Sequence, residues 1–337
     1  MIAIVALVVT FLVSLLFPYA LGPVLRRMGI LDIPNWRSAH TSTTIRGGGL
    51  APLLAMTIGY LILLADSQLR MEIGTLATIA VVSAAAGALG WLEDSRGLSV
   101  AVRALIQLGL GLAATTAIVL IEGGPWLLIP LFGVYIAGYI NVANFMDGIN
   151  GISAFHGLVV GASYAAYGIL LGIEWMAVAG AILAVAFVAF LPWNLRGKMF
   201  LGDVGSYLLG GGISVIGVAG VLNGVPVLLV LSPVVIYLAD SGVTLGTRVV
   251  RGERWQDAHR SHVYQRLTDM GVSHVRVTLT VAAITCIASL AGSLIIVEAG
   301  LWAVAVALLA VLSIVYLLLP RIVSAVNSSG RLREGAV

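Results

Sequence analysis

Charged side chains are scarce in this sequence. Asp, Glu, Lys and Arg make up 10% of the 337 residues, whereas hydrophobic residues make up 60%. Soluble domains carry about 25% charged residues, so the shortage excludes an ordinary soluble fold. The composition predicts a polytopic membrane protein, and no feature of it points to a nucleic acid partner.

Cysteine and several common catalytic motifs are also lacking. The single cysteine, Cys286, lies in an apolar run, which excludes a disulfide and a thiolate metal site and predicts a packing role. The sequence contains no G-x-x-x-x-G-K-[ST] loop and no G-x-S-x-G turn, so neither chemistry is supported. The first apolar segment, Met1–Leu21, lacks a basic start and a cleavage site, which predicts a retained helix rather than a signal peptide.

Apolar runs of spanning length predict an all-α fold with about eleven transmembrane helices. They lie at about 2–22, 48–65, 73–92, 102–121, 126–143, 152–172, 175–193, 205–222, 225–246, 277–297 and 300–320. Every lysine and arginine except Arg70 then falls on one side, which predicts an outer N-terminus and a cytoplasmic C-terminus. Residues 1–323 form one membrane domain, and 324–337 a polar cytoplasmic tail expected to be disordered.

The polar stretch Asn141–Gly151 reads N-V-A-N-F-M-D-G-I-N-G and follows an apolar run. Asn141, Asn144 and Asp147 recur at every third position, so they form one stripe at the end of a helix. Polar groups near the end of a lipid-buried helix are costly, which indicates a ligand or partner for them. The alternative is an ion pair between Asp147 and a neighbouring arginine. His156, inside the next helix, is predicted to pack.

Two earlier loops also carry polar groups. Arg37, His40 and Arg46 lie in the first, where they would grip an anionic headgroup or simply anchor the loop on the positive side. The adjacent acids Glu93 and Asp94 end the third predicted helix. They would hold Mg²⁺ together with substrate phosphates, or be ordinary solvated charges.

The loop W-N-L-R-G-K-M-F-L-G-D-V-G-S precedes another apolar helix. Asn194 contributes polarity, and Asp203 lies between glycines just before Ser206. Asp203 or Ser206 would cap the helix, but a helix N-terminus also suits an anion. Both interpretations stay open from the sequence.

The largest loop follows the ninth predicted helix, on which Asp240 and Arg248 share a face but are too far apart to pair directly. The loop contains His259, Arg260 and His262. Their spacing admits zinc binding, donation to phosphate oxygens, or an amphipathic segment on the membrane, and donation to phosphate is favoured.

Acids in separate predicted cytoplasmic loops, with basic residues in the others, suit a Mg²⁺–diphosphate substrate. The membrane-embedded frame indicates that the second substrate is a lipid. A secondary transporter is the alternative of a different class, but its polar groups would more often lie near the midplane in repeated broken helices. A lipid phosphatase or a flippase of another fold is a further alternative.

The chain resembles the polyprenyl-phosphate N-acetylhexosamine-1-phosphate transferases, relatives of the phospho-MurNAc-pentapeptide translocase. The resemblance runs from Asp32 to Leu267 through D-I-P-N-W-R-S-A-H with R-G-G-G, G-W-L-E-D, N-V-A-N-F-M-D-G-I-N-G, F-L-G-D-V-G-S and A-H-R-S-H-V-Y-Q-R-L. It implies transfer of N-acetylhexosamine-1-phosphate from a UDP-sugar to undecaprenyl phosphate, with release of UMP, at the cytoplasmic face of a bacterial inner membrane. The last motif favours an enzyme that starts O-antigen-like polysaccharide, and the pentapeptide translocase is the alternative.

The resemblance and the residue patterns together give a predicted site. The catalytic set is Glu93, Asp94, Asp203, His259 and His262, with Mg²⁺, or Mn²⁺ as its substitute, on Asp203 and Asp94. The substrate-binding set is Asn141, Asn144, Asp147, Asn194, Arg37, His40, Arg46 and Arg260. The resemblance also admits a homodimer.

Two positions depart from the family pattern. Glu93 stands where the family usually has a first Asp, which makes Asp94 the expected essential acid of the pair. Asn150 stands where a second Asp is common, which argues against a required metal ligand there.

Overall fold

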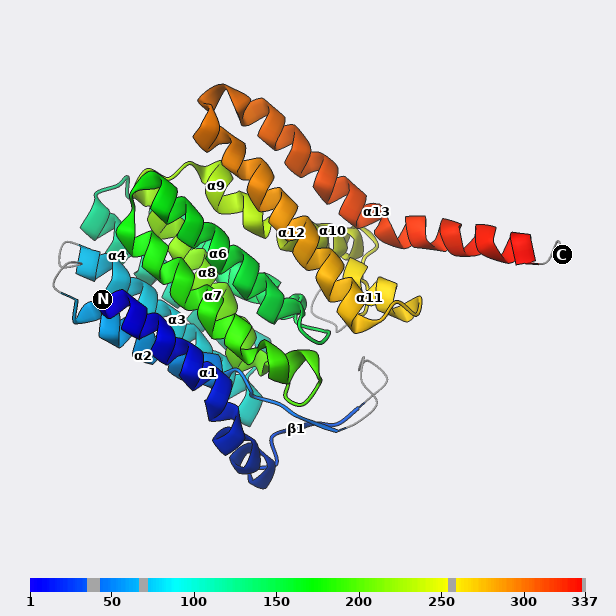
Figure 1. Ribbon diagram of the computed structural model, residues 1–337, viewed down its shortest axis with the longest axis horizontal. Helices are drawn as coiled ribbons and strands as arrows, with labels where there is room; N and C mark the ends of the chain where they lie inside the picture. The colour runs from blue at the N-terminus through cyan, green and yellow to red at the C-terminus, as the bar shows by residue number, and fades with distance from the viewer. Residues whose placement is uncertain (35–42, 67–71, 254–258, 335–337) are drawn as a thin grey trace.

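The computed structural model describes residues 1–34, 43–66, 72–253 and 259–334 of the chain, with side chains as far as Val326. It is a bundle of long helices, joined at one end by a two-residue pairing of β1 (Leu31–Asp32) with β2 (Thr44–Ile45) (Figure 1). The helices are α1 (Ile2–Arg27), α2 (Leu50–Leu64), α3 (Ile73–Arg96), α4 (Val100–Glu122), α5 (Leu128–Phe145), α6 (Ile152–Leu171), α7 (Glu174–Leu195), α8 (Gly202–Leu222), α9 (Val227–Leu231), η2 (Ser232–Val234), α10 (Val235–Val250), α11 (Val263–Asp269), α12 (His274–Val297), η3 (Ala299–Leu301) and α13 (Trp302–Glu334).

The helices confirm the predicted all-α membrane fold. Within the described residues, ten segments are long and apolar enough to cross a membrane, and the shorter apolar helix α2 accounts for the eleventh predicted span. The ninth span is broken, because α9 and α10 are separated by a 3-10 turn that contains Pro233. Proline lacks the amide that a continuous helix requires. The chain is an integral membrane protein.

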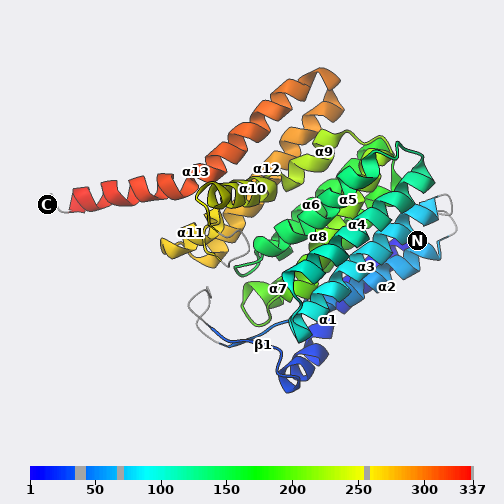
Figure 2. The same ribbon diagram turned by 180° about the vertical axis from the view of Figure 1, so that it is seen from behind.

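Helix α8 lies at the centre of the bundle. It packs against α2, α3, α4, α5, α6 and α7, and 94% of its apolar membrane-spanning stretch is buried inside the protein. Its run of glycines, Gly210, Gly211 and Gly212, is fully buried, which lets neighbouring backbones approach closely. The N-terminus of α8 is therefore held inside the bundle, at the end where the loops gather (Figure 2).

A second, smaller packing unit consists of α10, α11, α12 and α13. Its apolar cluster joins Tyr237, Tyr264 and Tyr316 to Met146 and Ile149 of the loop between α5 and α6. This loop therefore connects the large bundle to the smaller unit.

Two expectations about the C-terminal part were wrong. The chain does not lose its structure at residue 324, because α13 continues to Glu334 and projects from the bundle (Figure 1). Extending an existing helix adds one hydrogen bond for each residue ordered, which favours continuation past the membrane. Cys286 does not pack in the interior, because it is exposed on α12.

Candidate active site

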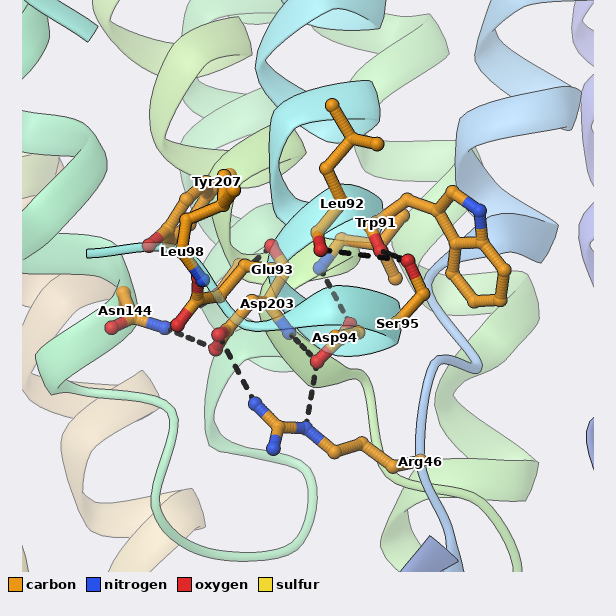
Figure 3. A network of polar contacts seen from close by, with 12 residues as sticks. Arg46, Trp91, Leu92, Glu93, Asp94, Ser95, Leu98, Asn144, Asp203 and Tyr207 are labelled. Atoms are coloured by element: carbon orange, nitrogen blue, oxygen red, sulfur yellow. Dashed lines mark hydrogen bonds and ion pairs between the residues drawn. The ribbon is translucent and has the colours of Figure 1, made fainter. Parts of the chain in front are cut away.

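Asp203 presents its carboxylate from the first turn of α8 (Figure 3). Asn144 Nδ2 of α5 donates to Oδ1 at 2.8 Å, and Arg46 Nη2 lies 3.1 Å from Oδ2. The side chain is 14% exposed, so it remains reachable. Asp203 is thus a fixed, partly open carboxylate at the end of the central helix.

Asp94 has a different environment from Asp203, although the two are adjacent. Its side chain is fully buried and accepts the backbone amides of Asp203 at 3.1 Å and Val204 at 3.0 Å. The first amides of a helix have no partner within the helix, and the helix dipole favours negative charge there. Asp94 therefore caps α8 from α3 and fixes the position of Asp203.

Arg46 balances both carboxylates from the loop after β2. Its Nε lies 2.7 Å from Asp94 Oδ1, while Nη2 approaches Asp203 (Figure 3). Burial acts to lower the pKa of Arg46, but the two carboxylates outweigh it and raise the pKa above its ordinary value. Because the side chain is 39% exposed, a substrate anion could reach part of it.

Glycines allow this arrangement by letting three backbones touch. A Cβ on Gly90 of α3 would collide with the backbone of Asp203, and one on Gly49 would collide with that of Gly205. Gly202 has φ +73°, and a Cβ there would lie 2.6 Å from the capping carboxylate. The glycines of the R-G-G-G and L-G-D-V-G motifs thus allow the two backbone segments to pack in direct contact.

The first acid of the pair has other partners than Asp94 has. Glu93 Oε1 pairs with Arg103 Nη1 of α4 at 2.8 Å, and Oε2 accepts the amide of Leu98 at 2.6 Å. One turn further along α4, Gln107 Oε1 accepts Asn141 Nδ2 at 2.6 Å. Arg103 and Gln107 were not in the predicted catalytic and substrate-binding sets, although their spacing of four residues indicates that both could face the cavity beside Glu93 and Asp94.

Asn194 links two of the loops. It is 3% exposed, its Oδ1 accepts the amide of Gly151 at 2.8 Å, and its Nδ2 donates to the carbonyl of Met199 at 3.3 Å. These contacts give Asn194 a structural role, and its predicted contact with substrate stays a prediction.

His156 takes the packing role expected of it. Its Nε2 lies 2.8 Å from Tyr139 Oη, and its ring stacks on Tyr237 with the centroids 3.5 Å apart. The side chain is buried within the bundle.

Two histidines, His259 and His262, lie near the buried carboxylate of Asp240 in the smaller packing unit. Asp240 Oδ1 lies 3.0 Å from His262 Nδ1, and Tyr316 donates to Oδ2 at 2.7 Å. An ionised carboxylate only accepts, so Nδ1 of His262 carries the proton and Nε2 is left as the acceptor. The His259 ring is 5.0 Å from that of His262, and burial, followed by the charges of His262 and Arg248, lowers the pKa of His259 to about 4.

The structure separates Arg260 from these histidines. Arg260 Nη2 pairs with Asp269 at 2.6 Å and lines a cavity between α10, α11 and α13. The zinc alternative finds no third ligand, since the described residues contain no group of three His, Cys, Asp or Glu that could hold a metal. Arg37 and His40 lie outside the described residues.

Asp147 lies between the Asp203 region and the histidine pair, at the end of α5. Burial raises its pKa to about 7, and the charges of Asp203 and Asp94 add to the rise. Its pKa in the unfolded chain is near the ordinary 3.8. The folded protein therefore retains a proton at Asp147 that the unfolded chain loses above about pH 4.

We expect replacement of Asp147 by Asn to change the pH dependence of stability. The stability that protonated Asp147 contributes is complete below about pH 4 and is lost as the pH rises through about 7. The melting temperature of Asp147→Asn minus that of the wild type should therefore increase between pH 5 and about 7 and stay constant at higher pH. Thermal unfolding of both proteins in the same detergent across this range measures the difference, and a pH-independent difference would contradict the prediction.

The residues around Asp203 include groups that suit Mg²⁺. Mg²⁺ sites commonly use one or two carboxylates and complete their shell with water and substrate phosphates. Asp203 fits, because its carboxylate is partly open and its partners, Asn144 and Arg46, are displaceable hydrogen-bond donors. Asp94 fits less directly, because its oxygens already accept two helix amides and Arg46.

Comparison with known proteins shows what the chain is similar to. Residues 76–221 match the model of glycosyl transferase family 4. A Bacillus subtilis protein named probable undecaprenyl-phosphate N-acetylglucosaminyl 1-phosphate transferase is 28% identical over 325 residues, which are 88% of this chain and 87% of that protein. The middle of the chain is therefore similar to glycosyl transferase family 4, and most of its length is similar to this relative.

Other relatives have related names. The undecaprenyl-phosphate alpha-N-acetylglucosaminyl 1-phosphate transferase of Yersinia pestis is 28% identical over 60% of this chain and 59% of its own. A phospho-N-acetylmuramoyl-pentapeptide-transferase of Desulforudis audaxviator is 26% identical over 62% of this chain and 74% of its own. The family match spans α3 to most of α8, which carry Asp94, Asn144 and Asp203, and ends before the histidine loop.

Proposed function

We propose that this protein transfers N-acetylhexosamine-1-phosphate from a UDP-sugar to undecaprenyl phosphate and releases UMP. The observation that carries the proposal is the partly open Asp203 carboxylate, held by Asp94, Arg46 and Asn144 at the N-terminus of a buried central helix. The relatives named above support the lipid acceptor and the sugar phosphate. The concentration of basic residues in the predicted cytoplasmic loops supports a site on the cytoplasmic face.

The proposed reaction is a single displacement at the sugar-bearing phosphorus. An oxygen of the lipid phosphate forms a bond to this phosphorus as its bond to the bridging oxygen breaks, and UMP leaves with that oxygen. A phosphate monoester has a second pKa of about 6, so the attacking group is mostly dianionic at neutral pH and needs little help from a base. The chief barrier is the approach of two anions.

The chain's own residues address this barrier. Arg46 is partly exposed and can donate to a diphosphate oxygen, and Asn144 offers an amide beside Asp203. Asp203 would hold Mg²⁺, which stabilises charge on the diphosphate and on departing UMP. Asp94 keeps Asp203 in place, and His262, oriented by Asp240, presents Nε2 as an acceptor or, when protonated, as a donor.

The reaction is tested by measuring UMP release by the purified protein from a panel of UDP-sugars. Each assay contains undecaprenyl phosphate and Mg²⁺. The donors to compare are UDP-GlcNAc, UDP-N-acetylfucosamine, UDP-N-acetylquinovosamine and UDP-MurNAc-pentapeptide. We expect release from one of the first three that requires both lipid and metal. Release from the pentapeptide substrate alone would replace the proposal by the peptidoglycan reaction, and a covalent phospho-enzyme on Asp94 would contradict the single displacement.

A further inference from the structure

A second charged site lies on the other side of the Asp240 cluster. Between α10, α11 and α13 the protein encloses a cavity of about 660 Å³. Thr244 and Val263, whose polar groups hydrogen-bond to Asp240, line this cavity, so they separate it from the carboxylate. The three helices lie together in both views of the ribbon (Figures 1 and 2).

Arginine dominates the lining of the cavity. Five guanidinium groups and one carboxylate line it among the described residues, which gives 5 − 1 = +4: Arg248, Arg251, Arg260, Arg266, Arg321 and Glu253. Two of these charges have acidic partners. Arg248 pairs with Glu253 at 3.0 Å, and Arg260 pairs with Asp269 at 2.6 Å. The remaining positive charges belong to Arg251, Arg266 and Arg321, which come from three separate segments of the chain.

A convergence of this kind favours a bound anion. The buried Arg248 already has Glu253 as its counter-charge, so the argument depends on Arg251, Arg266 and Arg321, which are exposed around the same cavity. Arginines that only mark the cytoplasmic side have no need to converge, because like charges repel one another. These three line one cavity, which fits an anion with several acceptor oxygens.

The other wall of the cavity is apolar and is formed by residues of predicted membrane spans. Val243, Leu317 and Leu318 line it, and Val243 is 50% exposed on the surface of a predicted span. A ligand with a phosphate and an attached hydrocarbon part would satisfy both walls. Basic pockets between membrane helices at the cytoplasmic surface are suited to anionic lipid headgroups.

We propose that this arginine cavity binds a phosphate group, supplied by an anionic phospholipid of the inner leaflet. The site is distinct from the one around Asp203 and does not depend on the proposed transfer reaction. Occupancy would tie α11 and α13 to α10, and so would stabilise the loop that carries His262.

The test measures binding of phosphatidylglycerol to the purified full-length protein in neutral detergent with EDTA, by native mass spectrometry. EDTA removes metal from the Asp203 region, so failure of the transfer proposal leaves this measurement unaffected. The double variant Arg266→Gln/Arg321→Gln removes two exposed charges of the cavity. The matched control, Arg26→Gln/Arg276→Gln, removes two exposed arginines from α1 and α12, away from the cavity.

We expect saturable binding that is about 30-fold weaker in the cavity variant, the effect of two basic groups next to an anionic headgroup. Binding should be unchanged in the control and largely retained in Arg266→Lys/Arg321→Lys, and a melting temperature close to that of the wild type shows that the cavity variant has folded. Glycerol phosphate should also be tested as a competitor of phosphatidylglycerol. If it displaces the lipid from the same arginines, the phosphate site is supported, with a soluble phosphate as its ligand. Equal weakening in the cavity and control variants, or no weakening in either, would overturn the proposal.

Discussion

Replacing Asp203 by Asn should lower UMP release by about 100- to 1,000-fold, the range for removing one preorganised electrostatic group. Asparagine keeps the shape, and its single oxygen can still accept from Asn144 or from Arg46, though not from both. The backbone amides of α8 still bind Asp94, so the α8 terminus should stay intact. What is lost is the negative charge that would hold Mg²⁺. The measurement is UMP release as a function of Mg²⁺ concentration, with the melting temperature recorded in parallel.

The matched control for this variant is Asp269→Asn, which removes an exposed carboxylate from α11. Asp269 pairs with Arg260 rather than with any residue around Asp203. Its UMP release should stay within a few-fold of the wild type, since single exposed ion pairs contribute little. If Asp203→Asn keeps near-normal activity and an unchanged Mg²⁺ requirement, Asp203 is not the metal ligand.

The helices could be predicted from the sequence because lipid imposes a simple rule. Every backbone polar group within the hydrocarbon must be satisfied internally, so a spanning apolar run has to be a helix. The predicted ninth run, 225–246, nevertheless concealed a break at Pro233, since hydropathy does not register the missing amide. The continuation of α13 was missed for the opposite reason, because polar composition was taken as disorder.

The site was predictable in its parts but not in its pairings. The polar loops marked Asp94, Asn144 and Asp203, and the structure brings these three together with Arg46. The sequence could not show that Asp94 faces the amides of α8, because this depends on close backbone contact at Gly90. Nor could it separate Arg260 from His262, which are two residues apart but line different spaces.

Asp240 is the largest omission from the predicted site. Its place on one face of α10 with Arg248 was evident, and the prediction that the two do not pair is confirmed, because Arg248 pairs with Glu253 instead. The partners of Asp240 come from distant segments, His262 after α10 and Tyr316 on α13. No local spacing reports such a contact.

Replacing Asp240 by Ala should therefore produce the largest loss of stability, about 3–5 kcal/mol, as expected for breaking a buried, hydrogen-bonded charge. The change leaves His262 Nδ1, the Val263 amide and Tyr316 Oη without their acceptor. Thermal unfolding followed by intrinsic fluorescence measures the loss. A melting temperature equal to that of the wild type would show that the cluster does not stabilise the smaller packing unit.

Two milder variants distinguish the carboxylate from the packing around it. Tyr316→Phe removes one donor and should cost about 1 kcal/mol. Asp240→Asn keeps the shape, but its amide cannot accept at both positions, so His262 loses its fixed orientation while much of the fold is retained. If His262 acts on the substrate through Nε2, Asp240→Asn should lower UMP release and shift the pH profile of this activity. Both effects should exceed what the variant's modest change in melting temperature would explain. Tyr316→Phe should change stability with little effect on that profile, because the carboxylate still orients the ring.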